Sequence, residues 1–146
     1  MALIEFKHVK KAFGPKVVYE DLNLEVNAGE ALTIIGGSGM GKSVMLKLLI
    51  GLLRVDGGSI VFDGVDIAGT PEREYAAVRR RIGMLFQGAA LFDSLSVMDN
   101  VAYGIREHEH RLPEKDVRAK VAKALEDVGL PGIAHLFPSV LSGGLR

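Results

Sequence analysis

The sequence predicts an α/β fold, and three segments of the chain support that prediction. Residues 22–27 alternate strictly between apolar and polar side chains, which is typical of a strand with one face in water. Residues 31–35 form a short apolar run, as expected of a strand covered on both faces in a parallel sheet. Residues 42–53 carry apolar side chains on almost every helical face, which indicates a buried core helix. With 146 residues, the chain is expected to form one domain.

The N-terminal segment predicts two strands joined by a turn. Residues 3–9 have a strand pattern, residues 22–27 supply the second strand, and residues 10–16 contain a turn flanked by basic side chains. Phe13 lies in this turn, where an aromatic side chain could stack on a nucleobase. The residues alone favour local packing under the turn, because single exposed apolar side chains are common.

The loop between the predicted buried strand and helix fits the pattern G-x-x-x-x-G-K-[ST] at every fixed position. Its glycines let the backbone curl so that N–H groups point at phosphate oxygens, and the helix adds the positive end of its dipole. In such a loop Lys42 reaches the β- and γ-phosphates and the Ser43 hydroxyl ligates Mg²⁺. The sequence therefore predicts a phosphate-binding loop made of Gly36, Gly37, Ser38, Gly39, Met40, Gly41, Lys42 and Ser43.

After the buried helix, residues 59–67 predict a hairpin with Asp63-Gly64 at its tip. A short helix follows, with Thr70 expected at its N-cap and Pro71 at its first position. That helix ends in three arginines, residues 79–81. They could contact phosphate or nucleic acid, but they also suit the negative end of a helix dipole, and we favour this second interpretation.

A second buried strand is predicted at residues 82–86, and Gln87 follows it directly. Ligands of open α/β sheets bind at the carboxyl ends of the strands, so Gln87 is expected on the same edge as the phosphate-binding loop. Residues 97–104 predict a short helix. A longer amphipathic helix runs from residue 114 to about residue 128, is closed by a C-cap at Gly129, and has an apolar stripe of Val117, Val121, Ala124, Leu125 and Val128.

Two further polar groups are candidate binding residues. His108 and His110 could clip a metal ion, but a solvated loop is favoured because no further ligands lie nearby in the sequence. Ser142, Gly143 and Gly144 are typical of a helix start that leaves backbone N–H groups free, which makes them a second potential phosphate site.

The composition excludes several classes of protein. Eighteen basic and eighteen acidic residues cancel, so no global charge attracts nucleic acid or an anionic membrane surface. The longest apolar stretch is too short to span a bilayer, and residues 1–7 lack the architecture of a signal peptide. The absence of cysteine excludes disulfides and thiol catalysis. A cytoplasmic protein is expected, with any link to a membrane made through a partner and not by direct insertion.

The phosphate-binding loop, Gln87 and the segment Leu141-Ser142-Gly143-Gly144, in that order, resemble the nucleotide-binding subunit of an ATP-binding cassette (ABC) transporter. The resemblance implies a P-loop NTPase (RecA-like) core with an N-terminal antiparallel β subdomain and an α-helical subdomain. Residues 1–146 correspond to the N-terminal part of that domain. Residues 1–87 match the β subdomain and P-loop core, and residues 88–146 match the Q-loop and helical subdomain up to the signature motif.

The resemblance also implies roles for single residues. Phe13 matches the aromatic residue that stacks on adenine, and residues 36–43 match the Walker A loop. Lys42 would neutralise charge on the γ-phosphoryl group of ATP, and Ser43 and the Q-loop residue Gln87 would hold Mg²⁺. Two subunits of such transporters sandwich ATP, so Ser142, Gly143 and Gly144 would bind the γ-phosphate held by a second nucleotide-binding subunit.

Residues 82–97 are similar to the ATPase subunits of Mla/Mce-type systems, which move phospholipids or related lipids. In this family the segment after Gln87 docks on a transmembrane permease. The resemblance therefore implies a peripheral location on the inner face of the cell membrane, through that partner.

Part of the family pattern is missing. The Walker B aspartate and the catalytic glutamate lie downstream of the signature motif, and no acidic residue here follows a suitable apolar run. The chain alone is expected to bind ATP with little or no turnover. Strands that flank residues 31–35 in the family also come later in sequence, so open apolar edges are expected there. A non-catalytic nucleotide-binding fragment or modulator, and a non-transport P-loop ATPase, remain alternatives.

Overall fold

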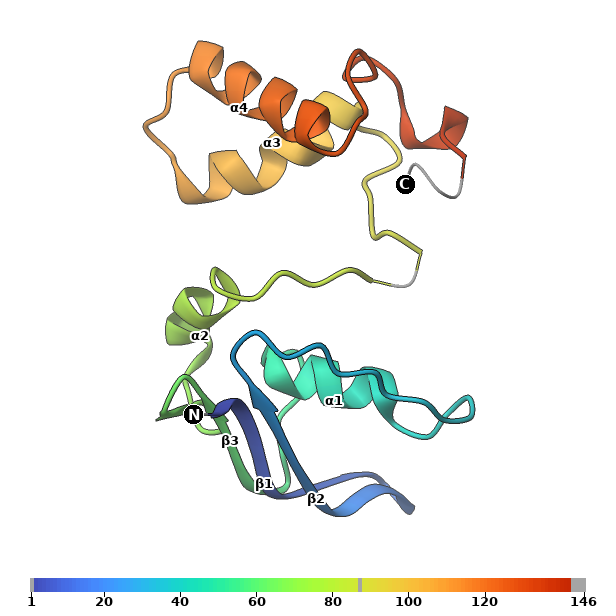
Figure 1. The fold of residues 1–146 in the computed structure, drawn as a ribbon, viewed down its shortest axis with the longest axis vertical. Helices are drawn as coiled ribbons and strands as arrows, with labels where there is room; N and C mark the ends of the chain where they lie inside the picture. Colours follow the sequence, from blue (N-terminus) through green and yellow to red (C-terminus); the bar gives the residue numbers. More distant parts are fainter. Residues whose placement is uncertain (1, 87, 143–146) are drawn as a thin grey trace. The chain divides into compact units, whose positions relative to one another are not determined.

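The computed structural model describes residues 2–86 and 88–142 and consists of two compact units, Met1–Gly83 and Met84–Arg146 (Figure 1). The first unit is an antiparallel sheet with two helices. The second unit is helical. Neither unit contains, among the described residues, a helix long and apolar enough to cross a membrane.

The first unit contains a four-stranded sheet in the order β2-β1-β3-β4. Its long strands are β1 (Ala2–Phe13), β2 (Lys16–Asn27) and β3 (Gly57–Phe62), and β4 (Val65–Asp66) is short. All neighbours are antiparallel, and Phe6 of β1 pairs with Leu24 of β2 on one side and Ile60 of β3 on the other. The two predicted N-terminal strands are thus confirmed, but they run further than predicted, because the turn between them is only Gly14 and Pro15.

The predicted hairpin at residues 59–67 is confirmed. Phe62 pairs with Val65 across the turn. Asp63 and Gly64 both have positive φ angles, of 52° and 78°. Two left-handed central residues define a type I′ turn, whose twist matches that of the flanking strands. This explains why an Asp-Gly pair forms the tip.

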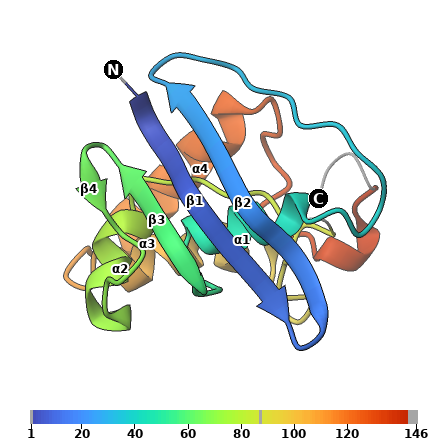
Figure 2. The ribbon, with the colours of Figure 1, turned by 90° about the horizontal axis from the view of Figure 1, so that it is seen from below.

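Helix α1 (Lys42–Leu49) lies against one face of the sheet (Figure 2). It ends four residues earlier than predicted, because Gly51 has a φ of 68° and Leu52 N–H bonds back to Lys47 O at 2.9 Å. This pattern closes a helix. The helix is also less buried than predicted: Leu46 is 45% exposed, since the sheet covers only one helical face. The core of the unit consists of Phe6, Val9, Met45, Leu48, Leu49, Ile60, Phe62, Ile67 and Tyr75.

Helix α2 (Glu72–Arg79) begins one residue later than predicted, with Pro71 as the N-cap. Its last residue, Arg79, donates from Nε to the carbonyl of Ile50 at 2.8 Å, and from Nη2 to the carbonyl of Gly51 at 3.3 Å. These carbonyls end α1, so the arginine serves the negative end of a neighbouring helix. Hydrogen bonding to Glu72 raises the pKa of Arg79.

The two predicted buried strands at residues 31–35 and 82–86 are absent from the sheet. Ile35 is 90% exposed and Leu85 is 83% exposed. A strand needs a hydrogen-bonded neighbour, and the described residues provide none for either segment. The prediction of strands covered on both faces was therefore wrong for this chain, and the expected open apolar surface at residues 31–35 is present.

The second unit contains α3 (Val97–His108), α4 (Glu114–Asp127) and the 3₁₀ helix η1 (Pro138–Val140). Its core is formed by Val97, Ala102, Val117, Val121, Leu125 and Leu141. The predicted stripe of α4 is narrower than expected, because Ala124 and Val128 are exposed. The predicted closure at Gly129 is present, but the C-cap is Val128, one residue earlier than predicted. Gly129 N–H donates to Glu126 O at 2.9 Å and Leu130 N–H to Leu125 O at 2.8 Å.

Candidate functional site

The predicted phosphate-binding loop connects residues 31–35 with α1. Gly39 and Gly41 have φ angles of 79° and 94°, a left-handed conformation that glycine adopts without the cost of a Cβ atom. Gly41 is the N-cap of α1, so Lys42 and Ser43 are the first two residues of the helix. Residues 36–40 are exposed to solvent. Ser43 in the first turn of α1 is exposed as well, so the loop and this residue are open to solvent, as phosphate binding requires.

Lys42 folds back over the loop. Its ammonium donates to the carbonyl of Gly36 at 2.6 Å and to that of Gly37 at 2.7 Å. An ammonium has three donors. Two of them bond the loop within the described part of the chain, which leaves the third for an incoming anion. Lys42 thus fixes residues 36 and 37 of the loop and brings a positive charge next to them.

The Gly41 carbonyl is the first acceptor of α1. Val44 N–H donates to it at 2.6 Å and Met45 N–H at 3.1 Å. The N–H groups of residues N-terminal to Val44 come before the first helical hydrogen bond, so they have no partner inside the helix. They are the groups that a phosphate would satisfy, and Ser43 places a hydroxyl beside them.

Phe13 ends β1 and is 43% exposed. The Nζ atom of Lys11 lies 5.2 Å from the centroid of its ring. Asp56 fixes this strand end, because its carboxylate accepts from Lys11 Nζ at 2.8 Å and from Ala12 N–H at 2.7 Å. The Lys11 ammonium and, to a lesser extent, the Ala12 N–H lower the pKa of Asp56. The ring is thus partly exposed at the end of β1, beside the Lys11 ammonium.

The other predicted site residues are separate from this loop in the chain. Gln87, Gly143 and Gly144 lie outside the described residues. Ser142 belongs to the second unit and is exposed. His108 ends α3, and both His108 and His110 are exposed. The described residues contain no group of three or more histidine or acidic side chains that could hold a metal ion.

One residue near the loop was not predicted. Tyr19 of β2 donates its hydroxyl to the carbonyl of Gly41 at 2.7 Å. A sequence pattern cannot find this contact, because it depends on how β2 packs against the start of α1, 22 residues later in the chain.

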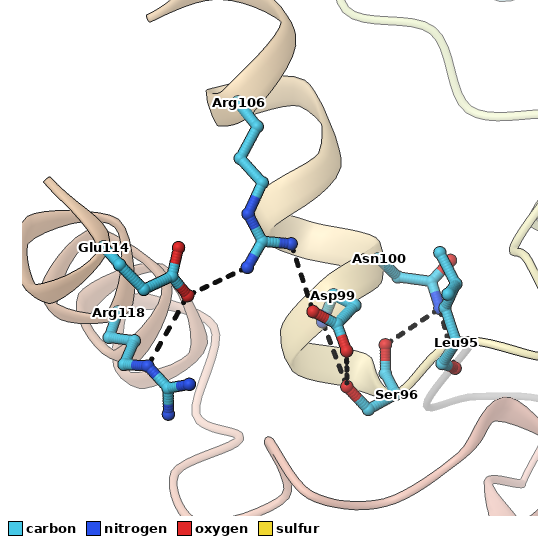
Figure 3. A network of polar contacts seen from close by, with 7 residues as sticks. All are labelled: Leu95, Ser96, Asp99, Asn100, Arg106, Glu114 and Arg118. Carbon is cyan, nitrogen blue, oxygen red and sulfur yellow. Dashed lines mark hydrogen bonds and ion pairs between the residues drawn. The ribbon is translucent and has the colours of Figure 1, made fainter. Parts of the chain in front are cut away.

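In the second unit, a polar network fixes the segment that follows Gln87 (Figure 3). The Asn100 amide nitrogen donates to the carbonyls of Leu95 at 3.1 Å and Ser96 at 3.0 Å. The same nitrogen donates to the Phe92 carbonyl at 3.1 Å, and Asn100 Oδ1 accepts from Phe92 N–H at 2.8 Å. The rings of Phe92 and Tyr103 lie 5.0 Å apart, and each is 47% exposed. Two aromatic side chains, Phe92 of the loop and Tyr103 of α3, therefore lie together at the surface.

The same network joins α3 to α4. Ser96 caps α3 by accepting from Asp99 N–H at 3.1 Å and donates its hydroxyl to Asp99 at 2.7 Å. Arg106 bridges Asp99 at 3.1 Å and Glu114 at 2.9 Å, and Glu114 lies in the first turn of α4. The Ser96 hydroxyl and the Arg106 guanidinium lower the pKa of Asp99. The network lies in the second unit and contains no group of the phosphate-binding loop.

Comparison with known proteins gives concordant results. The family model described as ABC transporter matches residues 19–146. The "Intermembrane phospholipid transport system ATP-binding protein MlaF" of Haemophilus influenzae is 50% identical over 143 residues, which cover 98% of this chain and 54% of that protein. The "Probable ribonucleotide transport ATP-binding protein mkl" of Mycobacterium leprae is 45% identical over 98% of this chain and 41% of its own length. The chain thus spans about half the length, or less, of these relatives.

Solved structures give a similar result. A dimeric structure of the ATP-binding cassette MJ0796 bound to ADP and Pi is 28% identical, with a TM-score of 0.86 over 97% of this chain and 64% of that one. The structure of cbiO1 from Clostridium perfringens, part of the ABC transporter complex cbiONQ, is 27% identical, with a TM-score of 0.81 over 98% of this chain and 57% of that one.

Proposed function

The chain belongs to the ABC transporter family, and from this premise we propose that it is an ATP-binding subunit whose loop at residues 36–43 holds the phosphates of ATP. One observation carries the proposal. Lys42, the first residue of α1, places its ammonium across the loop on the carbonyls of Gly36 and Gly37. A fixed cation and free helix N–H groups in one loop are the two elements that bind phosphate.

The remaining groups of the site have distinct roles. Phe13 offers an exposed ring at the end of β1, which suits stacking on adenine. The Ser43 hydroxyl suits Mg²⁺, which neutralises phosphate charge when bound. By resemblance to the family, Gln87 assists Ser43 with the metal, and Ser142, Gly143 and Gly144 contact the γ-phosphate held by a second nucleotide-binding subunit.

Phospholipid or a related lipid is the substrate class we propose for the transporter. The 50% identity to the phospholipid-transport protein supports lipid over the ribonucleotides named for the relative at 45%. Residues 92–96 are held rigid by Asn100 and expose Phe92 beside Tyr103, which suits docking on a transmembrane permease. That partner would locate the protein at the inner face of the membrane.

The binding of Mg-ATP to the 146-residue chain tests the first part of the proposal. Isothermal titration is expected to show binding that Lys42→Ala weakens at least tenfold, because a charge-assisted contact with phosphate is lost. Lys47→Ala is the matched control, since Lys47 is an exposed lysine of the same helix. Equal affinity of the Lys42→Ala variant would contradict the assignment of the loop.

Two further measurements distinguish a transporter ATPase from a non-catalytic nucleotide-binding fragment and from a non-transport ATPase. Steady-state ATP hydrolysis that depends on Lys42 would exclude a purely nucleotide-binding fragment. Copurification of the protein from membranes with a permease-like partner would support transport, whereas a protein recovered only without such a partner would favour a non-transport ATPase.

A further inference from the structure

The Gly41 carbonyl accepts a third hydrogen bond besides those that begin α1. The hydroxyl of Tyr19 donates to it at 2.7 Å. Val44 N–H and Met45 N–H reach the same oxygen at 2.6 Å and 3.1 Å. Three donors thus converge on one carbonyl oxygen, and the Tyr19 hydroxyl restrains this peptide group from outside the helix. The side chain of a sheet residue thus bonds the peptide group at which the phosphate-binding loop ends and the helix begins.

The side chains of β2 pack closely against Gly41. A Cβ atom on Gly41 would lie 2.8 Å from the Tyr19 hydroxyl oxygen and 2.8 Å from Cγ1 of Val18. Both distances are shorter than real Cβ contacts. Gly41 is also buried, unlike residues 36–40 of the loop. The loop is therefore seated against β2 at Gly41, while residues 36–40 are open to solvent.

The Tyr19 hydroxyl remains a donor at physiological pH. Burial raises the pKa of Tyr19, and the nearby Met45 N–H, which favours the phenolate, only partly opposes this effect. A neutral phenol donates its proton, and the Gly41 carbonyl can only accept one. The raised pKa of Tyr19 therefore keeps the hydroxyl protonated and able to donate at neutral pH.

Tyr19 also connects the loop to the part of the sheet that carries Phe13. It pairs with Lys11 across the β1–β2 ladder, two residues before Phe13 in β1. The candidate adenine contact and the candidate phosphate contact are thus joined through one strand pair and one hydroxyl.

We infer that Tyr19 is a positioning residue for the phosphate-binding loop, which orients the Gly41 peptide so that the N–H groups at the start of α1 face the phosphates of a nucleotide. The inference rests on the proposed function, since it assumes that the loop binds a polyphosphate. Tyr19 itself makes no contact with the phosphates in this scheme. It acts through Gly41.

A second tyrosine provides a matched control. Tyr75 is buried and donates its hydroxyl to the carbonyl of Leu49 at 3.3 Å, at the opposite end of the same helix. Tyr19→Phe and Tyr75→Phe each remove one hydroxyl that bonds a backbone carbonyl of α1 or its cap. Of the two carbonyls, that of Gly41 belongs to the loop and that of Leu49 does not.

The experiment measures the affinity of the 146-residue chain for Mg-ATP and for Mg-tripolyphosphate, which has no base or sugar. Tyr19→Phe is expected to weaken both ligands by the same factor, about fivefold, because one net hydrogen bond that orders the loop is lost. Tyr75→Phe is expected to leave both affinities unchanged. Phe13→Ala is expected to weaken ATP only.

Several outcomes would overturn the inference. Unchanged affinities in Tyr19→Phe would do so, as would an equal loss in Tyr75→Phe, which would indicate general weakening of α1. A loss for ATP but not for tripolyphosphate would assign Tyr19 to the base. Binding of ATP by the unsubstituted chain separates these results from failure of the proposed function, and no binding at all would overturn both.

Amide hydrogen exchange gives a readout that needs no ligand. Tyr19→Phe is expected to speed exchange of the Val44 and Met45 amides, which share the Gly41 acceptor, while the amides of the β3–β4 hairpin stay unchanged. Unchanged exchange at Val44 and Met45 would overturn the inference even if affinity changed.

Discussion

The four-stranded sheet and the segment at residues 31–35 belong to the same unit, but they are stabilised in opposite ways. Strand β1 has hydrogen-bonded neighbours on both sides, and its residue Val9 is fully buried. Residues 31–35 have no strand partner among the described residues, and Ile35 is 90% exposed. Antiparallel strands can pair with their sequence neighbours across a short turn, whereas a parallel strand needs a partner that returns over a long crossover. Pairing of β1 with β2 across a short turn, and with β3 over a long connection, therefore accounts for the sheet, and the lack of any such partner accounts for the open segment.

The largest expected effect contrasts two isoleucines. Ile60 of β3 is 1% exposed and Ile35 is 90% exposed. Ile60→Ala is expected to lower the free energy of unfolding by about 2–5 kcal/mol, because it removes buried methyl groups and leaves a cavity. Ile35→Ala is expected to change it by less than about 0.5 kcal/mol. Urea unfolding followed by circular dichroism measures both, and similar losses in the two variants would contradict the difference between sheet and segment.

A smaller effect contrasts two glycines with almost the same backbone angle. Gly58 in β3 has a φ of 78° and Gly39 in the loop has a φ of 79°. A Cβ atom at Gly58 would lie 2.3 Å from the His8 carbonyl oxygen, whereas one at Gly39 would have no atom within 4 Å. Gly39→Ala is expected to cost about 1–2 kcal/mol for the left-handed conformation alone. Gly58→Ala is expected to cost more, since backbone atoms must also move.

The same urea unfolding measurements test this prediction. Equal costs for the two glycine variants would show that conformation alone, and not the packing of β1 on β3, determines the role of Gly58. A larger cost for Gly39→Ala would contradict the description of the loop as open.

The smallest effect concerns acid and the end of β1. The pKa of Asp56 is lowered by Lys11 and the Ala12 N–H, so its contribution to stability is present above its unfolded pKa of about 3.9. This contribution is lost as the pH falls through the lower folded pKa. Asp56→Asn is expected to flatten the acid limb of the stability curve below about pH 4. A titration of unfolding midpoint against pH measures this, and an unchanged acid limb would show that the Asp56 contacts add no stability.

Local patterns were sufficient to predict much of this fold. The Asp63-Gly64 turn, the helix closure at Gly129 and the alternation of residues 22–27 depend on neighbouring residues, and the structure confirms each of them. The prediction failed where the outcome depended on a distant partner. Apolar runs at residues 31–35 and 82–86 indicate strands only if other strands flank them.

In the candidate site, too, local features could be predicted from the sequence and tertiary contacts could not. The glycine spacing of residues 36–43 predicted a loop before a helix, and α1 begins at Lys42. The Tyr19 hydroxyl could not be predicted, because β2 and the loop meet only through tertiary packing. The bonds of Asp56 to Lys11 and Ala12, beside Phe13, likewise join residues more than 40 positions apart in the chain.

The central claim is that the backbone at the start of α1, with Lys42, binds the phosphates of ATP. Amide hydrogen exchange of the 146-residue chain with and without Mg-ATP tests it most directly, because it identifies the N–H groups that gain protection. We predict protection at residues 36–45 and no change in the β3–β4 hairpin. Saturating Mg-ATP without added protection at residues 36–45 would contradict the claim.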